Sequence, residues 1–164
     1  MADSFLQFAL NFPLKTRAEQ DWCTKTMNTL TDLLEFDADS DPEEKEQLAK
    51  ELGDLGHDVM SEGYDFLDFE FSINATEMHI YAEESGTPEL VAAFLQQYLE
   101  KFQPQGSLSF SWAFTCSKMR SGQFGGGAAF VTAKSIKFID TQSWCEEQPE
   151  KLNPPATEQA QRAH

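Results

Sequence analysis

Apolar side chains recur at every second position in several short segments, which is the spacing of β-strands that bury one face. The clearest segment runs from Leu108 to Cys116, where large apolar residues alternate with serine, alanine and threonine. It leads into a loop with two cations and several glycines, and then into a second β-rich segment. The same reasoning predicts further strands at 6–12, 67–73, 78–82, 128–133 and 136–139.

Three other segments carry apolar residues at helical spacing, and each begins with a residue that favours a helix N-terminus. Proline at the first helical position strengthens two of these predictions, because the N–H that it lacks would have no partner there. The predicted helices span 16–34, 42–52 and 88–102, with N-caps at Thr16, Asp41 and Thr87.

The resulting order of elements is strand, helix, strand, strand, helix, strand, which is the split βαβ or ferredoxin-like arrangement of the α+β class. We therefore predict a single α+β domain over residues 1–146, with an added C-terminal hairpin that extends an antiparallel sheet. Residues 32–63 are expected to form an acidic insertion of loop and short helix. From about residue 147 the composition turns to Glu, Gln, Pro and Ala, which predicts a disordered tail at 147–164.

Charge is distributed very unevenly along the chain. Its 164 residues carry a formal net charge of -16, from 28 acidic and 12 basic residues. Fifteen acids and only two lysines lie between Asp32 and Glu70, whereas residues 101–137 contain five cations and no acid. Such a surface repels nucleic acid and anionic membranes and favours basic partners. We exclude direct nucleic-acid binding, also because the open face of the predicted sheet offers one tyrosine and one histidine among carboxylates.

Composition also indicates a compartment. Three cysteines without a C-x-x-C pair argue against a disulfide framework. The first residues lack the basic region of a signal peptide, and no apolar run reaches the ~18 residues that a membrane span needs. We therefore expect a reduced, cytoplasmic protein without a membrane segment or a cofactor. A calcium loop is excluded at D-A-D-S-D, because Pro42 stands where glycine is needed, and no zinc-type Cys/His cluster is present.

The acidic insertion has two interpretations. A run of charge is commonly a solvated face that keeps a protein soluble. The more specific interpretation is a docking surface for a basic protein. The surface could also mimic DNA, with carboxylates that occupy a groove of the partner where DNA phosphates bind. The candidate partner-binding residues are Asp37, Asp39, Asp41, Glu43, Glu44, Glu46, Glu51, Asp54 and Asp58.

The glycine-rich loop after Cys116 is the second candidate site. Backbone amides of its glycines, together with Lys118 and Arg120, have the composition of an anion-binding nest, and the same cations favour a reactive thiolate. The competing interpretation is a hairpin whose glycines provide positive φ and close packing, with Cys116 buried as a small apolar residue. The candidate residues are Cys116, Ser117, Lys118, Arg120, Phe124, Gly125, Gly126 and Gly127.

One segment resembles a known group of proteins. Between Phe110 and Trp144, the strings W-A-F-T-C-S-K and F-G-G-G and the C-terminal tryptophan resemble a group of uncharacterised small acidic proteins from bacteria and their phages. The resemblance implies no activity, but a phage or mobile-element setting favours a protein that interacts with host proteins. The leading hypothesis is thus a non-enzymatic protein that binds a basic, nucleic-acid-binding partner. The alternatives are a small-molecule, phosphate or enzymatic site at the glycine loop, and a homodimer formed through edge strands.

Overall fold

The computed structural model describes residues 2–36, 39–64 and 66–152. Within them the chain is an α+β structure of five helices and one six-stranded antiparallel sheet, with strand order β2-β3-β1-β4-β5-β6. The strands are β1 (Ser4–Pro13), β2 (Glu70–Ile73), β3 (Glu77–Ala82), β4 (Ser107–Cys116), β5 (Gly125–Thr132) and β6 (Ile136–Asp140). The helices are α1 (Arg17–Leu34), α2 (Pro42–Leu52), α3 (Asp54–Glu62), α4 (Pro88–Phe102) and α5 (Thr141–Leu152).

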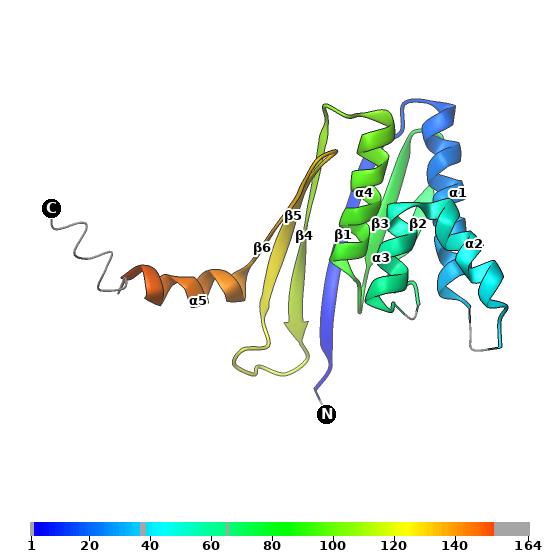
Figure 1. Cartoon of the computed structure of the whole chain (residues 1–164). Helices are drawn as coiled ribbons and strands as arrows, with labels where there is room; N and C mark the ends of the chain where they lie inside the picture. Colours follow the sequence, from blue (N-terminus) through cyan, green and yellow to red (C-terminus); the bar gives the residue numbers. More distant parts are fainter. Residues whose placement is uncertain (1, 37–38, 65, 153–164) are drawn as a thin grey trace, which may run out of the picture.

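The core lies between the sheet and the helices in front of it (Figure 1). Alternate residues of β1 and β3 face these helices, and the apolar stripes of α1 and α4 cover them, as the two periodicities require. Aromatic rings also pack between α1 and α4: Trp22 of α1 stacks on Phe94 of α4 with ring centroids 5.6 Å apart. Fully buried members of this core include Met27, Leu30, Met78, Ile80, Phe94, Leu95, Tyr98 and Leu99.

Local signals explain the helix starts. Thr16 and Glu19 form a complete capping box at α1, and the Asp41 carboxylate accepts a 2.9 Å hydrogen bond from the Glu43 N–H at α2. Thr87 occupies the N-cap of α4, but its hydroxyl donates to Asp68 Oδ2 at 2.6 Å instead of capping its own helix. All three predicted helices are therefore present.

Three details differ from the sequence-based expectations. The acidic insertion folds into two helices, because α3 follows α2 with only Gly53 between them. Strand β2 begins at Glu70, three residues later than predicted. The expected tail is helical over its first six residues, 147–152, since α5 starts directly after β6 and continues to Leu152. The rest of the expected tail, 153–164, lies outside the described residues.

Helix α5 leaves the main body, whereas β6 stays paired with β5 at the edge of the sheet (Figure 1). Helix α4 lies in front of β1, whereas β5 and β6 lie to its left and α5 points away from the sheet. No residue of α5 is buried. The part of the chain nearest its C-terminus is therefore much less covered than the part around β1 and β3.

Candidate functional site

The acidic surface, defined by the described members of the predicted acidic set, is held by a compact pair of helices, α2 and α3. Leu52, Leu55 and Val59 are buried and anchor both helices to the core. Gly56 of α3 approaches the backbone of Ala49 in α2 so closely that a Cβ at this position would overlap the Ala49 carbonyl. The two helices therefore present their acids on a fixed support instead of a loop. The described acids of this surface are Asp39, Asp41, Glu43, Glu44, Glu46, Glu51, Asp54 and Asp58.

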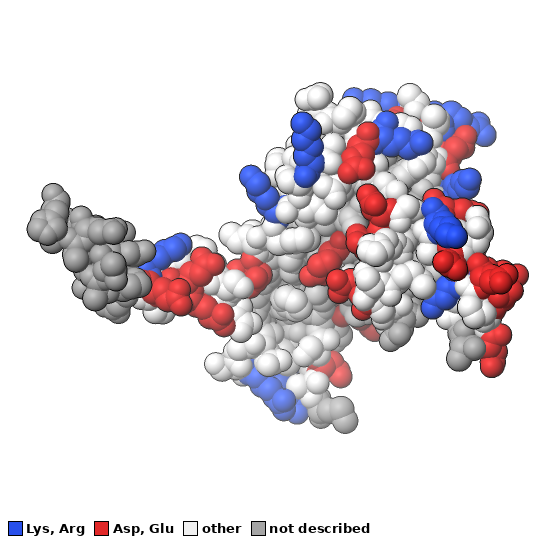
Figure 2. Space-filling view, viewed as in Figure 1, with Lys and Arg blue, Asp and Glu red and all other residues white. Residues whose placement is uncertain are grey.

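Every one of these side chains is exposed, and Figure 2 shows red atoms gathered over the end where α2 lies. Within the described chain, the carboxylates of α2 and α3 form no ion pair; the pairs Arg17–Asp21 and Lys151–Glu147 lie elsewhere. Asp41 is engaged as the N-cap of α2. Asp37, the remaining predicted member of this set, lies outside the described residues. Within the described chain, the carboxylates of α2 and α3 therefore keep their charge without an ion-pair partner.

The three glycines at the end of the predicted loop lie in a strand. Gly125, Gly126 and Gly127 belong to β5 and pair with β4, and none of them has a positive φ. Successive amides of a strand point in opposite directions, so these three do not form a concave nest. The Gly126 N–H donates instead to the Thr141 hydroxyl at 3.0 Å. Close packing, the other role expected of these glycines, is present, because a Cβ on Gly127 would lie 2.5 Å from Trp112 Cε2.

The cations of the loop do not come to these glycines. Residues 117–124 form the β4–β5 connection, in which the Ser117 hydroxyl accepts a 2.8 Å hydrogen bond from the Asp3 N–H. Lys118 and Arg120 are exposed and line neither of the two hollows at the glycines. The smaller hollow, of about 240 Å³, is lined in part by Phe124, the last aromatic residue of the loop.

The larger hollow is an apolar groove of about 650 Å³ between β5 and the first turn of α5. The glycines of β5 line it together with two tryptophans, Trp112 of β4 and Trp144 of α5. Lining residues are Trp112, Gly125, Gly126, Gly127, Ile139, Asp140, Thr141, Trp144 and Cys145. The five residues from Ile139 onwards were not predicted as site residues. A sequence signal was present for the part in α5: Trp144, Gln148 and Leu152 are spaced four residues apart beyond the last strand, which is the spacing of one side of a helix.

Cys116 has no histidine beside it in the described chain. It faces the helix side of the sheet, because it follows Trp112 and Phe114 at strand spacing, whereas His79 lies on the opposite side, stacked on Tyr81 at 5.0 Å. Register separates them further, since Cys116 pairs with Ser4 and His79 with Asn11. Seven residues of β1 correspond to roughly 23 Å at about 3.3 Å per residue. The cysteines are free, and Cys116 is half-buried.

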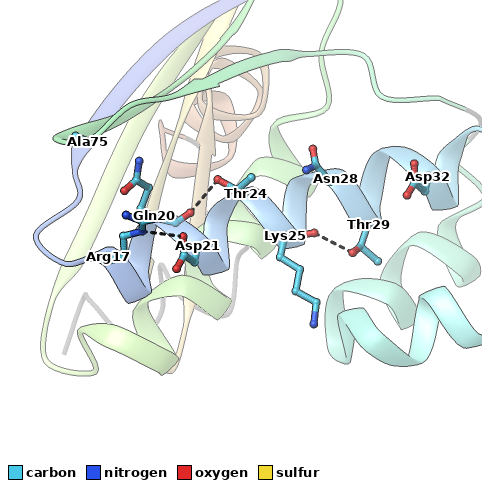
Figure 3. A pocket seen from close by; sticks show the side chains of 9 residues that line it. All are labelled: Arg17, Gln20, Asp21, Thr24, Lys25, Asn28, Thr29, Asp32 and Ala75. Carbon is cyan, nitrogen blue, oxygen red and sulfur yellow. Dashed lines mark hydrogen bonds and ion pairs between the residues drawn. The ribbon is translucent and has the colours of Figure 1, made fainter.

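A second groove, of about 630 Å³, follows the outer face of α1 and reaches Ala75 (Figure 3). Its polar groups are mostly committed to their own helix: Thr24 donates to the Gln20 carbonyl at 2.9 Å, and Arg17 pairs with Asp21. Figure 3 shows the labelled side chains spread along the helix without converging on one point. This groove has the character of an ordinary polar helix surface.

One buried carboxylate has a structural role. Glu19 Oε2 accepts hydrogen bonds from the N–H groups of Lys15 and Thr16 and from the Thr16 hydroxyl, and Oε1 accepts from the Tyr98 hydroxyl at 2.8 Å. Burial raises the pKa of Glu19, but these hydrogen bonds outweigh it and hold that pKa below its ordinary value. Burial and the bond to Glu19 raise the pKa of Tyr98. This pair joins α1 to α4 inside the core.

Comparisons with protein-family models, curated proteins and solved structures found no match to this chain. The described residues contain no group of three or more His, Cys, Asp or Glu side chains placed to hold a metal ion. Among the helices that the structure describes, none is both long and apolar enough to cross a membrane. The acidic surface and the apolar groove are two candidate functional features of the described chain.

Proposed function

We propose that this protein acts by binding a basic surface of another protein through the acidic surface on α2 and α3. The observation that carries the proposal is that these carboxylates are exposed on anchored helices without ion-pair partners in the described chain. Like charges held close together repel, and a basic partner relieves that repulsion while the long-range field accelerates encounter. Binding of this kind is expected to weaken as salt is added.

The partner class that fits best is a nucleic-acid-binding protein. Its binding groove is positive and accommodates regularly spaced negative charge, so that carboxylates there would compete with phosphates. The protein would then act as an inhibitor that occupies the groove, without catalysing a reaction.

A phosphate or small-molecule site at Gly125–Gly127, with chemistry at Cys116, has less support. The loop cations do not line the hollows at these glycines, and His79 is on the other side of the sheet. The groove there is mostly apolar, which suits a hydrophobic contact better than an anion.

We also propose that the first four strands adopt the ferredoxin-like split βαβ arrangement. Support comes from the order β2-β3-β1-β4 with antiparallel neighbours, and from α1 and α4 as the two connecting helices. In this description β5 and β6 extend the sheet beyond β4, and the α2–α3 pair is inserted between α1 and β2.

The test is a pull-down from bacterial lysate at low and high salt, with three forms of the chain. The first is the wild type, and the second carries the charge reversals Glu43→Lys, Glu44→Lys and Glu46→Lys. The third is a matched control with Glu83→Lys, Glu84→Lys and Glu100→Lys, which changes the net charge equally at exposed acids away from α2 and α3. Circular dichroism checks the fold, and a Glu→Gln version of the first triple serves if reversal near the α2 N-terminus unfolds that helix.

We expect the wild type and the control to retain the same basic protein at low salt and to release it at high salt, while the α2 triple variant retains none. DNA added to the retained complex should displace the protein if the partner binds nucleic acid. Equal retention by both triple variants would show that net charge alone, and not this surface, is responsible. A wild type that retains no basic protein would refute the proposal.

A further inference from the structure

The face of the sheet opposite the core is open at β1, β2 and β3. On β1 the side chains of Gln7, Ala9 and Asn11 alternate with the buried ones and are all exposed. The register pairs Ala9 with Tyr81 and Asn11 with His79, so both of these β3 residues lie on the open face too. Helices α1 and α4 pack on the other face, where the core lies (Figure 1). This part of the sheet is therefore accessible to a partner.

Two aromatic rings form a stacked pair on the open face. The rings of His79 and Tyr81 have centroids 5.0 Å apart, with 25° between their planes, and both side chains are half-buried. Each ring has a small cross-strand neighbour, Ala9 of β1 for Tyr81 and Ser72 of β2 for His79. The rings therefore stand above these neighbours and leave part of their π surface exposed.

Carboxylates border this ring pair. Glu77 and Glu83 lie before and after it at strand spacing, and Glu70 of β2 is paired with Tyr81. Hydrogen bonding to Glu70, together with the charges of Glu70 and Glu83, raises the pKa of the Tyr81 hydroxyl. Asn11 Nδ2 donates to Glu77 Oε2 at 3.0 Å. Strands β1, β2 and β3 contain no lysine or arginine, and none of these carboxylates has an ion-pair partner in the described chain.

Charge and shape together select a guanidinium group as the occupant. Carboxylates and the π faces of aromatic rings both attract a cation, and the same groups repel an anion. The guanidinium of arginine is planar, so it stacks on a ring while its N–H groups donate to a carboxylate in the same contact. The ammonium of lysine is compact and strongly hydrated, and it has no flat face. A carboxylate offers about four lone-pair sites, so the bonds from Tyr81 and Asn11 leave acceptors free.

We propose that the open face around His79 and Tyr81 binds arginine side chains of a protein partner. We call this face the ring surface and define it by the two rings and the three carboxylates around them, Glu70, Glu77 and Glu83. By the order along β3, the outer side of the His79 ring is towards Glu77 and that of the Tyr81 ring is towards Glu83. A guanidinium that stacks on either ring therefore has a carboxylate within the same contact.

The ring surface is separate from the acidic surface on α2 and α3, because those helices lie on the other side of the sheet (Figure 1). It is also different in kind. The acidic surface offers charge alone, whereas the ring surface combines charge with flat π faces and therefore distinguishes arginine from lysine. The two proposals do not depend on each other, and either can fail alone.

The experiment is a titration of the full chain with a short, terminally blocked oligo-arginine peptide, followed by the NMR signals of the histidine imidazoles. His79 reports on the ring surface, and His57 of α3 reports on the acidic surface. The third histidine, His164, lies outside the described residues, and its signal is assigned with a His164→Gln variant. Low salt and about pH 8, where an unperturbed imidazole is neutral, keep the charges simple.

We expect oligo-arginine to shift the His79 signal in a saturable way. Oligo-lysine of equal length should bind there about two- to fivefold more weakly, the range that an exposed cation–π contact contributes. Tyr81→Thr, which removes the ring but suits a strand, should weaken oligo-arginine binding by the same factor. Tyr81→Phe keeps the ring and should bind like the wild type.

Two charge variants complete the test, with circular dichroism as the check of the fold. The pair Glu70→Gln and Glu77→Gln should weaken binding at His79. The matched control Glu43→Gln, Glu44→Gln and Glu46→Gln removes more charge, but from α2, and should leave the His79 titration unchanged.

A His79 signal that oligo-arginine does not move would overturn the proposal, also where His57 alone responds. Equal affinity at His79 for oligo-arginine and oligo-lysine would overturn it as well, because attraction by net charge would then explain the binding. So would a Tyr81→Thr variant that binds as tightly as the wild type.

Discussion

Replacing Tyr98 by phenylalanine tests the buried hydrogen bonds that join α1 and α4. The hydroxyl of Tyr98 donates to Glu19 Oε1, for which it is the one donor in the described chain, while the three other bonds to this carboxylate go to Oε2. The variant keeps the ring and its contacts with Phe12 at 4.9 Å and Phe102 at 5.5 Å. The change therefore removes this charge-assisted hydrogen bond and also the 3.1 Å bond that Gln103 Nε2 donates to the Tyr98 hydroxyl. It leaves one buried carboxylate oxygen of Glu19 unsatisfied.

A hydrogen bond to a charged group contributes about 1.5–3 kcal/mol, so we expect Tyr98→Phe to lower the free energy of unfolding by about 2 kcal/mol. For a chain of this length that corresponds to a fall in Tm of roughly 4–8 °C. Urea and thermal denaturation followed by circular dichroism measure both quantities. The control is Tyr64→Phe, because Tyr64 is half-buried and its hydroxyl has no hydrogen bond in the described chain.

The loss in free energy of unfolding caused by Tyr98→Phe should also depend on pH. Because folding lowers the pKa of Glu19, its contribution is fully present above the ordinary Glu pKa of about 4.3 and is lost as pH falls through the folded-state value. The Tyr98 hydroxyl is one of the groups that lower this pKa, so its removal makes the folded-state pKa of Glu19 less depressed. The stability of the variant therefore falls less on acidification than that of the wild type. The difference between the two should therefore shrink on acidification. A Tyr98→Phe variant as stable as Tyr64→Phe at neutral pH would refute this account.

Two further predictions concern the β4–β6 region and the cysteines. Gly127→Ala should lower the free energy of unfolding by about 1–3 kcal/mol, since its Cβ would overlap the Trp112 indole, and chemical denaturation measures this; unchanged stability would mean that the indole has room to move. In dilute solution Cys145 should react first with an alkylating reagent and Cys23 last, because burial and the charge of Glu19 raise the Cys23 pKa to about 12. Mass spectrometry of partly labelled protein gives the order, and early labelling of Cys23 would contradict the buried position.

Local signals in the sequence were sufficient for much of the fold. Thr16 with Glu19, and Asp41 with Pro42, located helix starts correctly, because caps act within a single turn. Alternation located β1, β3 and β4 for the same reason. Helix α3 was not predicted, because Gly53, Gly56 and Gly63 lie in or beside it and glycine is a poor helix former. In the structure Gly56 is inside the helix, at a contact with α2 that no single-helix pattern reveals.

Long-range relations were the part that the sequence did not provide. The alternation of β4 correctly assigns Phe110 and Phe114 to one face, but only the tertiary structure shows that Phe110 is buried and Phe114 exposed. The glycines of β5 resemble a loop by composition, yet β4 and the Trp112 ring accommodate them in a strand. The acids of the acidic surface were selected from the local excess of charge alone, and the structure shows the described ones exposed. Their role in binding a partner stays a prediction.

The contact between Gly56 and Ala49 has a consequence for the speed and cost of recognition. Because the backbones of α2 and α3 touch, the carboxylates on them keep their spacing before any partner arrives. In the binding that we propose, little backbone entropy would therefore be lost from α2 and α3 when a complex forms. The contact thereby makes the acidic surface a rigid template, for which we expect fast association that is limited mainly by diffusion and salt.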